Sequence, residues 1–270
     1  DLYHHLHFYS PWGPKLNDVT PVLLTVHDLH ALERKRAEKR LRRKLGEASH
    51  MAFISNFAAQ EYTKHFSSLE KNTRVIINGV KHPPVVDEDA CKAWKQKYTD
   101  FLFTLGGLKR KNIHSLLAML EKNNQFDSVK NLKLIVAGGV KDKYKKELLA
   151  EAKQRGVQDK IIFLGAVSEQ HKYELIQACR AFVFPSLQEG FGLPIIEALH
   201  FGKPVFCSNK TSLPEVGGEM VYYWEHFDAA YMSNVLRHGL QDNDESLEHK
   251  MVMRKQYADS FDWNKNAQEY

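Results

Sequence analysis

Glu189 and Glu197 flank a short glycine-containing loop in the C-terminal half of the chain. Carboxylates repel phosphate, but they accept hydrogen bonds from the paired hydroxyl groups of a sugar or a ribose. Two such groups beside a loop that favours an anion therefore predict a ligand that carries both sugar hydroxyls and phosphate.

The elements around these glutamates fit such a ligand. The apolar run 181–184 is typical of a strand that is covered on both faces. Gly190 and Gly192 allow a sharp turn and a close approach of the backbone to the ligand. Pro194 suits the first position of a helix, whose free N–H groups favour an anion.

A second candidate group is the cationic run Lys109-Arg110-Lys111. It lies where a predicted strand, residues 101–107, gives way to a predicted helix, residues 113–122. A cation at this junction could neutralise a departing diphosphate, which is a large electrostatic contribution in transfer reactions. The alternative is a set of solvated loop cations.

The string from Phe184 to Ala198, Phe-Pro-Ser-x-x-Glu-Gly-Phe-Gly-Leu-Pro-x-x-Glu-Ala, resembles the E-x7-E motif of family 4 retaining glycosyltransferases of the bacterial surface-polysaccharide type. The strings at 54–57 and 75–80, Ile-Ser-x-Phe and Val-Ile-x-Asn-Gly-Val, resemble other hallmarks of that family. The resemblance implies the GT-B fold, in which two Rossmann-like α/β domains with parallel sheets hold a sugar nucleotide in a cleft.

The resemblance also implies roles for individual residues. Glu189 would hold sugar hydroxyls, Glu197 the ribose diol, and Arg110 with Lys111 the diphosphate. His27, at the end of the predicted strand 21–28, would lie near the anomeric carbon, whereas a packed histidine and a helix-capping Asp28 are the alternative. The full prediction is a catalytic set of His27, Arg110, Lys111 and Glu189, and a donor-binding set of Gly107, Val167, Gly190, Phe191, Gly192, Leu193 and Glu197. Some members carry an arginine where Gly107 stands, and Arg110 is expected to replace it.

Alternating strand and helix patterns predict two domains. Residues 1–80 would form an acceptor-side domain, residues 81–260 the nucleotide-sugar-binding domain, and residues 261–270 the start of a crossover helix. The first of these is shorter than a typical domain and carries no Gly-rich loop before residue 20, so we expect the chain to be incomplete at its N-terminus.

Residues 34–44 are strongly basic and follow a helical period. The simplest interpretation is a solvated helix face. An anionic membrane surface is the favoured partner, since each basic residue near it contributes on the order of 1 kcal/mol. No recognised nucleic-acid motif accompanies the basic run, so nucleic acid is not expected as a partner.

Composition sets the remaining expectations. No apolar run is long enough to span a bilayer, and no secretory signal is apparent. Three dispersed cysteines are typical of reduced core residues, which favours a cytoplasmic protein. The basic segment, together with the family resemblance, implies a peripheral position on the inner face of the plasma membrane. His4, His5 and His7 alternate faces of a strand and gather poorly around a metal. No metal site and no cofactor are predicted.

The residues and the resemblance together predict a glycosyltransferase that moves a hexose from a GDP- or UDP-sugar to a glycan or lipid-linked acceptor in lipopolysaccharide, capsule or exopolysaccharide synthesis. The resemblance implies that it is retaining and metal-independent. Two alternatives stay open. One is a sugar-nucleotide-binding fragment without catalysis. The other is a different GT-B enzyme, such as a phosphorylase or a nucleotide-sugar epimerase. The sequence leaves the sugar, the acceptor and the linkage undefined.

Overall fold

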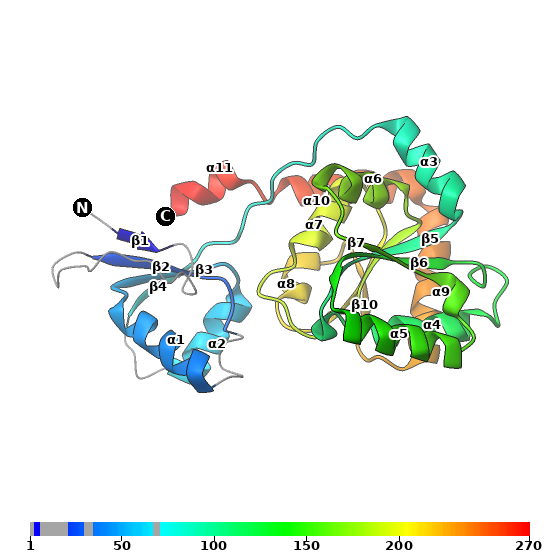
Figure 1. Ribbon diagram of the computed structural model, residues 1–270. Coiled ribbons are helices and arrows are strands. Elements are labelled where there is room, and N and C mark those ends of the chain that lie inside the picture. Colours follow the sequence, from blue (N-terminus) through cyan, green and yellow to red (C-terminus); the bar gives the residue numbers. More distant parts are fainter. Residues whose placement is uncertain (1–2, 6–20, 30–34, 67–70) are drawn as a thin grey trace. The chain divides into compact units, whose positions relative to one another are not determined.

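The computed structural model describes residues 3–5, 21–29, 35–66 and 71–270 (Figure 1). The chain divides into two compact units. The first unit comprises residues 1–80, 189–192 and 261–270, and the second comprises residues 81–188 and 193–260. The two units are described separately.

The first unit contains a parallel sheet with the strand order β1-β2-β3-β4. Its strands are β1 (Tyr3–His5), β2 (Val22–Val26), β3 (His50–Phe53) and β4 (Asn72–Val75), and its helices are α1 (Lys35–Glu47), α2 (Asn56–Phe66) and α11 (Trp263–Asn266), followed by a 3-10 turn, η4 (Ala267–Glu269). The predicted strand 21–28 is thus shorter than expected. The prediction for His7 lies outside the described residues.

The core of the first unit forms where α1 and α2 meet the sheet. Leu41, Leu45 and Ala48 are buried at the helical spacing predicted for the basic segment, and they pack with Phe53 and Phe66. The helix therefore turns an apolar stripe to the sheet, while its cations Lys39, Arg42 and Arg43 are exposed and Lys44 is half-buried.

The second unit contains a six-stranded parallel sheet with the order β10-β9-β8-β5-β6-β7. Its strands are β5 (Phe101–Gly107), β6 (Lys133–Val140), β7 (Ile161–Gly165), β8 (Ala181–Phe184), β9 (Val205–Ser208) and β10 (Tyr222–Trp224). Its helices are α3 (Glu88–Tyr98), α4 (Ile113–Asn123), α5 (Asp142–Gln154), α6 (Glu169–Ala178), α7 (Leu193–His200), α8 (Leu213–Gly217), α9 (Ala229–Glu245) and α10 (Leu247–Asp259), with short 3-10 turns η2 (Lys109–Lys111) and η3 (Gln158–Lys160).

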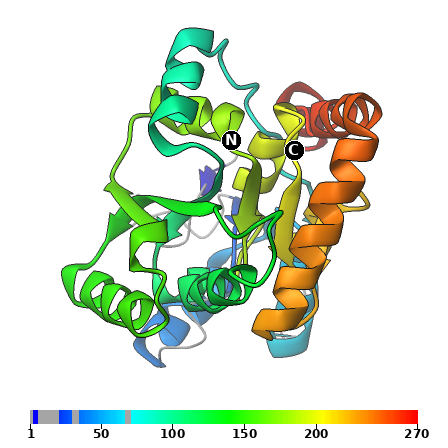
Figure 2. The same ribbon diagram turned by 90° about the vertical axis from the view of Figure 1, so that its right-hand side faces the viewer.

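This strand order is that of a doubly wound Rossmann sheet. If β5 to β10 are numbered 1 to 6, the strands lie in the order 3-2-1-4-5-6 when read from β7. Strands β6 and β7 lie on one side of β5, and β8, β9 and β10 lie on the other, so the strand order reverses between β5 and β8. Helices α4, α5 and α9 pack together, and α3, α6, α7 and α10 form a second group. Figure 2 shows α9, in orange, lying along the yellow strands that include β10.

Buried apolar strands and side-chain caps explain these boundaries. All four residues of β8 are buried, as a strand covered on both faces requires. Ser168 Oγ accepts a hydrogen bond from the His171 N–H and so caps the N-terminus of α6. Helix α7 begins at Leu193, so Pro194 is its second residue and not its first.

The parallel sheets and alternating elements confirm the predicted α/β class. Cys91, Cys179 and Cys207 are buried free thiols, as predicted, and burial raises the pKa of Cys179 to about 12. In the described part of the chain, every helix is too short or too polar to cross a bilayer.

Candidate functional site

The predicted phosphate-binding cations lie beyond the ends of the neighbouring strands β5 and β8. Arg110 follows β5 in η2, and its Nη1 donates a hydrogen bond to the Gln188 carbonyl at 2.8 Å. In return the Arg110 carbonyl accepts from the Leu187 N–H at 2.8 Å and from Ser186 Oγ at 3.2 Å. These bonds join two loops that lie 78 residues apart in the sequence.

Lys111 is the last residue of the same turn, η2, and its side chain reaches the end of the adjacent strand, β8. Its Nζ is 4.4 Å from the ring centroid of Phe184, the last residue of β8. Its side chain passes over Gly106, where an added Cβ would lie 3.0 Å from Lys111 Cε. Gly106 also has a φ of +90°, so glycine there provides both the backbone conformation and the space for the lysine.

Gly107 has no room for the arginine that some relatives carry at this position. An added Cβ would lie 2.3 Å from Val140 Cγ2 and 2.7 Å from the Gly139 carbonyl oxygen. The side of the backbone on which a side chain would grow is filled by β6. Arg110 is a cation at the same junction, but its guanidinium is already hydrogen-bonded to the Gln188 carbonyl.

Glu197 lies in α7 and is held by residues of α6. Lys172 Nζ is 2.7 Å from Glu197 Oε1, and the Tyr173 hydroxyl donates to the same oxygen at 3.4 Å. The side chains of Lys172 and Glu197 are only 19% and 14% exposed, so little water weakens this pair. Burial, together with the nearby carboxylates of Glu197 and Glu169, raises the pKa of Tyr173, which therefore stays a neutral donor.

Residues 189–192 belong to the first unit. Ser55 Oγ donates to the Gly190 carbonyl at 3.0 Å, and the Phe191 ring meets Phe261 edge-on at 6.0 Å between centroids. A Cβ on Gly190 would lie 2.1 Å from the His27 carbonyl oxygen, so only glycine fits there. His27 directly follows β2, and the structure places it near the predicted loop.

The remaining predicted residues occupy different environments. Glu189 is buried, at 8% exposure, whereas Leu193 is 42% exposed at the start of α7. Gly192 has a φ of +120°, which suits glycine. Val167 is half-buried between β7 and α6.

Sequence analysis missed the residues that hold the predicted ones in place: Ser55, Lys172, Tyr173, Ser186 and Gln188. Ser186 and Gln188 fall inside the family-like string 184–198, and Ser55 falls inside the string 54–57, so these strings could have directed attention to them. Lys172 and Tyr173 come from α6, where no quoted string marks them.

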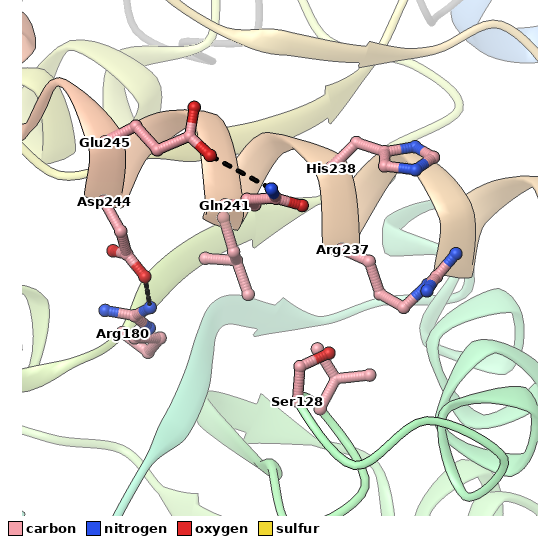
Figure 3. Close-up of a pocket in the computed structure, with 9 residues that line it drawn as sticks. Ser128, Arg180, Arg237, His238, Gln241, Asp244 and Glu245 are labelled. Atoms are coloured by element: carbon pink, nitrogen blue, oxygen red, sulfur yellow. Dashed lines mark hydrogen bonds and ion pairs between the residues drawn. The ribbon is translucent and has the colours of Figure 1, made fainter.

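The second unit also has a cavity that the sequence did not indicate (Figure 3). Its volume is about 540 Å³, and it is lined mainly by α9 with Ser128 and Arg180. Arg180 points to Asp244, and Gln241 Nε2 donates to Glu245 at 3.0 Å. None of the sequence-predicted site residues lines this cavity.

Comparisons with known proteins agree with the fold and the loop. The chain is 29% identical over 260 residues to O-antigen chain mannosyltransferase B of Escherichia coli. The aligned region covers 90% of this chain and 66% of that protein. Sucrose-phosphate synthase from Thermosynechococcus elongatus superimposes with a TM-score of 0.80 at 21% identity, covering 99% of this chain and 71% of that one.

A third similar protein is HepE of Anabaena, solved in complex with UDP and glucose. It superimposes with a TM-score of 0.75 at 19% identity and covers 93% of this chain and 70% of that one. These likenesses confirm the predicted GT-B fold. The chain spans about two thirds (66%) of the length of the mannosyltransferase that it resembles.

The family model described as glycosyl transferases group 1 matches residues 87–254, which is more than half of the chain. The matched range holds η2, the loop after β8 and α7, and so includes the junction where Arg110 meets Gln188. The chain therefore belongs to the group 1 glycosyl transferases.

Proposed function

We propose that the protein is a retaining glycosyltransferase. It transfers a hexose from a nucleotide diphosphate sugar to a glycan or lipid-linked acceptor in the assembly of a bacterial surface polysaccharide of the lipopolysaccharide type. The bond between the anomeric carbon and the diphosphate oxygen breaks, and the acceptor hydroxyl oxygen bonds to that carbon. The acceptor proton leaves to the departing diphosphate or to solvent.

The observation that carries this proposal is the junction between β5 and β8. In open α/β sheets a ligand binds beyond the carboxyl ends of the strands, at the point where the strand order reverses. Arg110 and Lys111 lie at that point, hydrogen-bonded to or packed against the end of β8 and its loop. Two cations fixed there suit a diphosphate that gains negative charge as it leaves.

The other predicted residues complete the donor site. Glu197 accepts hydrogen bonds from the ribose diol, with its orientation fixed by Lys172 and Tyr173. Glu189 holds sugar hydroxyls, and N–H groups of residues 190–192 contact sugar or phosphate. His27 directs its imidazole to the anomeric carbon. HepE, solved with UDP and glucose, supports a nucleotide-sugar donor. We propose a GDP- or UDP-hexose.

We also propose that the protein works in the cytoplasm, on the inner face of the plasma membrane, and that the basic segment 34–44 contacts anionic lipid. In its described part, Lys39, Arg42 and Arg43 are exposed. Arg42 and Arg43 each lie beside a glutamate four residues away on the same helix, at 3.0 and 3.4 Å. Such exposed pairs contribute little and leave the cations available to lipid phosphates.

Calorimetric titration with GDP, UDP and ADP, each alone and as its hexose conjugate, tests the donor site. We expect one nucleotide to bind and Glu197→Ala to weaken it by tenfold or more. Glu219→Ala, at an exposed glutamate of the same unit, is the matched control and should bind normally. Circular dichroism checks that Glu197→Ala is folded despite the loss of the partner of Lys172.

Product analysis then separates the alternatives. A glycosylated acceptor supports transfer, whereas a sugar phosphate or an epimerised sugar nucleotide would identify a phosphorylase or an epimerase. Donor binding without any of these products would favour the binding fragment. Failure of all nucleotides to bind to the folded chain would contradict the proposed donor site.

A further inference from the structure

Two histidines and an aspartate meet in the second unit, outside the predicted donor site. His82 lies in the segment between β4 and α3, His200 is the last residue of α7, and Asp259 is the last residue of α10. One potential ligand atom of each lies within 4.8 Å of the others. Imidazole nitrogen and carboxylate oxygen are the donor atoms that Zn²⁺ takes in proteins.

The separations within the cluster fit a shared cation better than hydrogen bonds. Nδ1 of His200 and Nδ1 of His82 lie 3.3 and 3.7 Å from the same oxygen, Oδ1 of Asp259. Good N–H···O hydrogen bonds are shorter, at about 2.7–3.2 Å. In a tetrahedral zinc site with bonds of about 2.0–2.1 Å, neighbouring ligand atoms lie about 3.3 Å apart.

The two rings do not stack face to face, because their planes are inclined by 56° with the centroids 4.9 Å apart. His82 is 68% exposed and belongs to a loop, so its ring can close on an ion with little repacking. His200 is the rigid member, with only 4% of its side chain exposed.

Nε2 of His200 is buried with no hydrogen-bond partner among the described residues, so the protein leaves the ring's hydrogen bonding incomplete.

We propose that His82, His200 and Asp259 bind one Zn²⁺ or a similar divalent transition-metal ion, with solvent in the fourth position. The role is structural. Lys81 and Ser260 are the first and last residues of the second unit, so the ion joins its two chain ends to α7, the helix that carries Glu197.

Titration of the metal-free full chain with ZnCl2 tests the site. We expect one equivalent to bind at this site and to raise the Tm by roughly 5–10 °C at saturation, because an ion that binds only the folded state stabilises it by mass action. Co²⁺ in place of Zn²⁺ should give the intense visible absorption of a tetrahedral complex.

Two exposed positions provide variants that keep the buried His200. His82→Ala and Asp259→Asn should each weaken Zn²⁺ binding at least tenfold and abolish most of the Tm shift. His65→Ala is the matched control, because His65 lies 3.6 Å from Glu61 in a pair with only one carboxylate. It should retain both signals. The proposal is overturned if the metal-free chain binds no Zn²⁺, or if His82→Ala and Asp259→Asn bind it as the unaltered chain does.

Discussion

At the scale of single residues, the site depends on partners that hold each functional group in one orientation. Glu197 has its Oε1 beside Lys172 at 2.7 Å, and Arg110 is bonded through both its guanidinium and its carbonyl to the loop after β8. Groups fixed in this way need little reorganisation when a ligand arrives, and this is the condition under which electrostatic stabilisation is most effective.

Lys111→Ala tests the proposed diphosphate contact. We expect turnover to fall by about 10²-fold, because a fixed cation at the departing charge is lost. The measurement is transfer rate with the donor identified by titration, with thermal unfolding to confirm that the variant is folded.

Lys109→Ala is the control for this variant. Lys109 lies in the same 3-10 turn, but its Nζ pairs with Glu147 at 3.0 Å and its side chain is 72% exposed. Turnover should stay within about twofold of the unaltered protein. Equal losses in the two variants would show that the turn needs positive charge in general and not Lys111 in particular.

Local patterns in the sequence mark these residues as candidates, but they do not mark the partners that hold them. The spacing from Glu189 to Glu197 marks both glutamates, and the strand-to-helix junction marks Arg110 and Lys111, because each lies in a continuous local pattern. Lys172 reaches Glu197 from another helix, and His82, His200 and Asp259 come from three separate segments. Such meetings depend on tertiary packing, which a local pattern does not encode.

At the scale of elements, the end of β5 is shaped by its contact with β6. The register shifts between Leu105 and Gly107, and Gly138 has a φ of +105° opposite that point. We expect Gly107→Ala to lower the free energy of unfolding by about 1–3 kcal/mol, since its Cβ would overlap Val140 and the Gly139 carbonyl. Urea denaturation measures the change.

Gly139→Ala, in the same strand pair, is the comparison. An added Cβ there meets nothing within 4 Å. Stability should be unchanged or rise by up to about 1 kcal/mol, because alanine restricts the unfolded chain more than glycine does. A similar loss in both variants would contradict the steric explanation.

Helices α4 and α5 are joined by a charged network that predicts a dependence on pH. Glu151 contacts His114 and accepts from Arg155 Nε at 2.8 Å, and Arg155 also reaches Glu121 at 2.7 Å. Burial alone would raise the pKa of Glu151, but its bonds to His114 and Arg155 outweigh burial and lower the pKa from the ordinary value of 4.5.

A carboxyl group whose folded-state pKa is lowered stabilises the folded protein above the unfolded-state pKa. That stabilisation is lost as the pH falls through the lower, folded-state value. Glu151→Gln should therefore cost about 1 kcal/mol at pH 7 and progressively less as the pH falls below about 4.5. Urea denaturation across this range measures it. Glu147→Gln, in the exposed pair with Lys109, should change stability by less than about 0.5 kcal/mol throughout.

The existence and type of most elements followed from the sequence, but some ends did not. The predicted strands 101–107 and 181–184 and the predicted helix 113–122 agree closely with β5, β8 and α4. In contrast, the predicted strand 21–28 is shortened to β2, and β4 ends at Val75, the first residue of the family-like string 75–80. The Ile76 N–H still bonds to Phe53, whereas the Val80 N–H bonds to the carbonyl of Phe261, which is distant in sequence. A periodic pattern cannot show that its last residues pair with another segment.

At the scale of the whole molecule, the basic helix predicts binding to anionic vesicles and not to neutral ones. We expect Lys39→Glu with Arg43→Glu to weaken binding by tenfold or more, since each basic residue near the surface contributes about 1 kcal/mol. Sedimentation with vesicles at two salt concentrations measures this. Lys92→Glu with Lys97→Glu on α3 makes the same charge change elsewhere and should have a smaller effect. Binding that is insensitive to salt and to the first variant would contradict a role for this helix.

The composition of the first unit has a consequence for synthesis of the chain. The unit draws on residues 1–80, 189–192 and 261–270, and Gly79 lies so close to Trp263 that a Cβ would overlap its backbone. Contacts of such high sequence separation form slowly, because a long loop must close, at a cost in chain entropy, before the contacts stabilise the fold. While the second unit is still being translated, the first unit therefore lacks residues 189–192 and 261–270, and part of its apolar surface stays exposed. Chaperones bind proteins in this partly folded state.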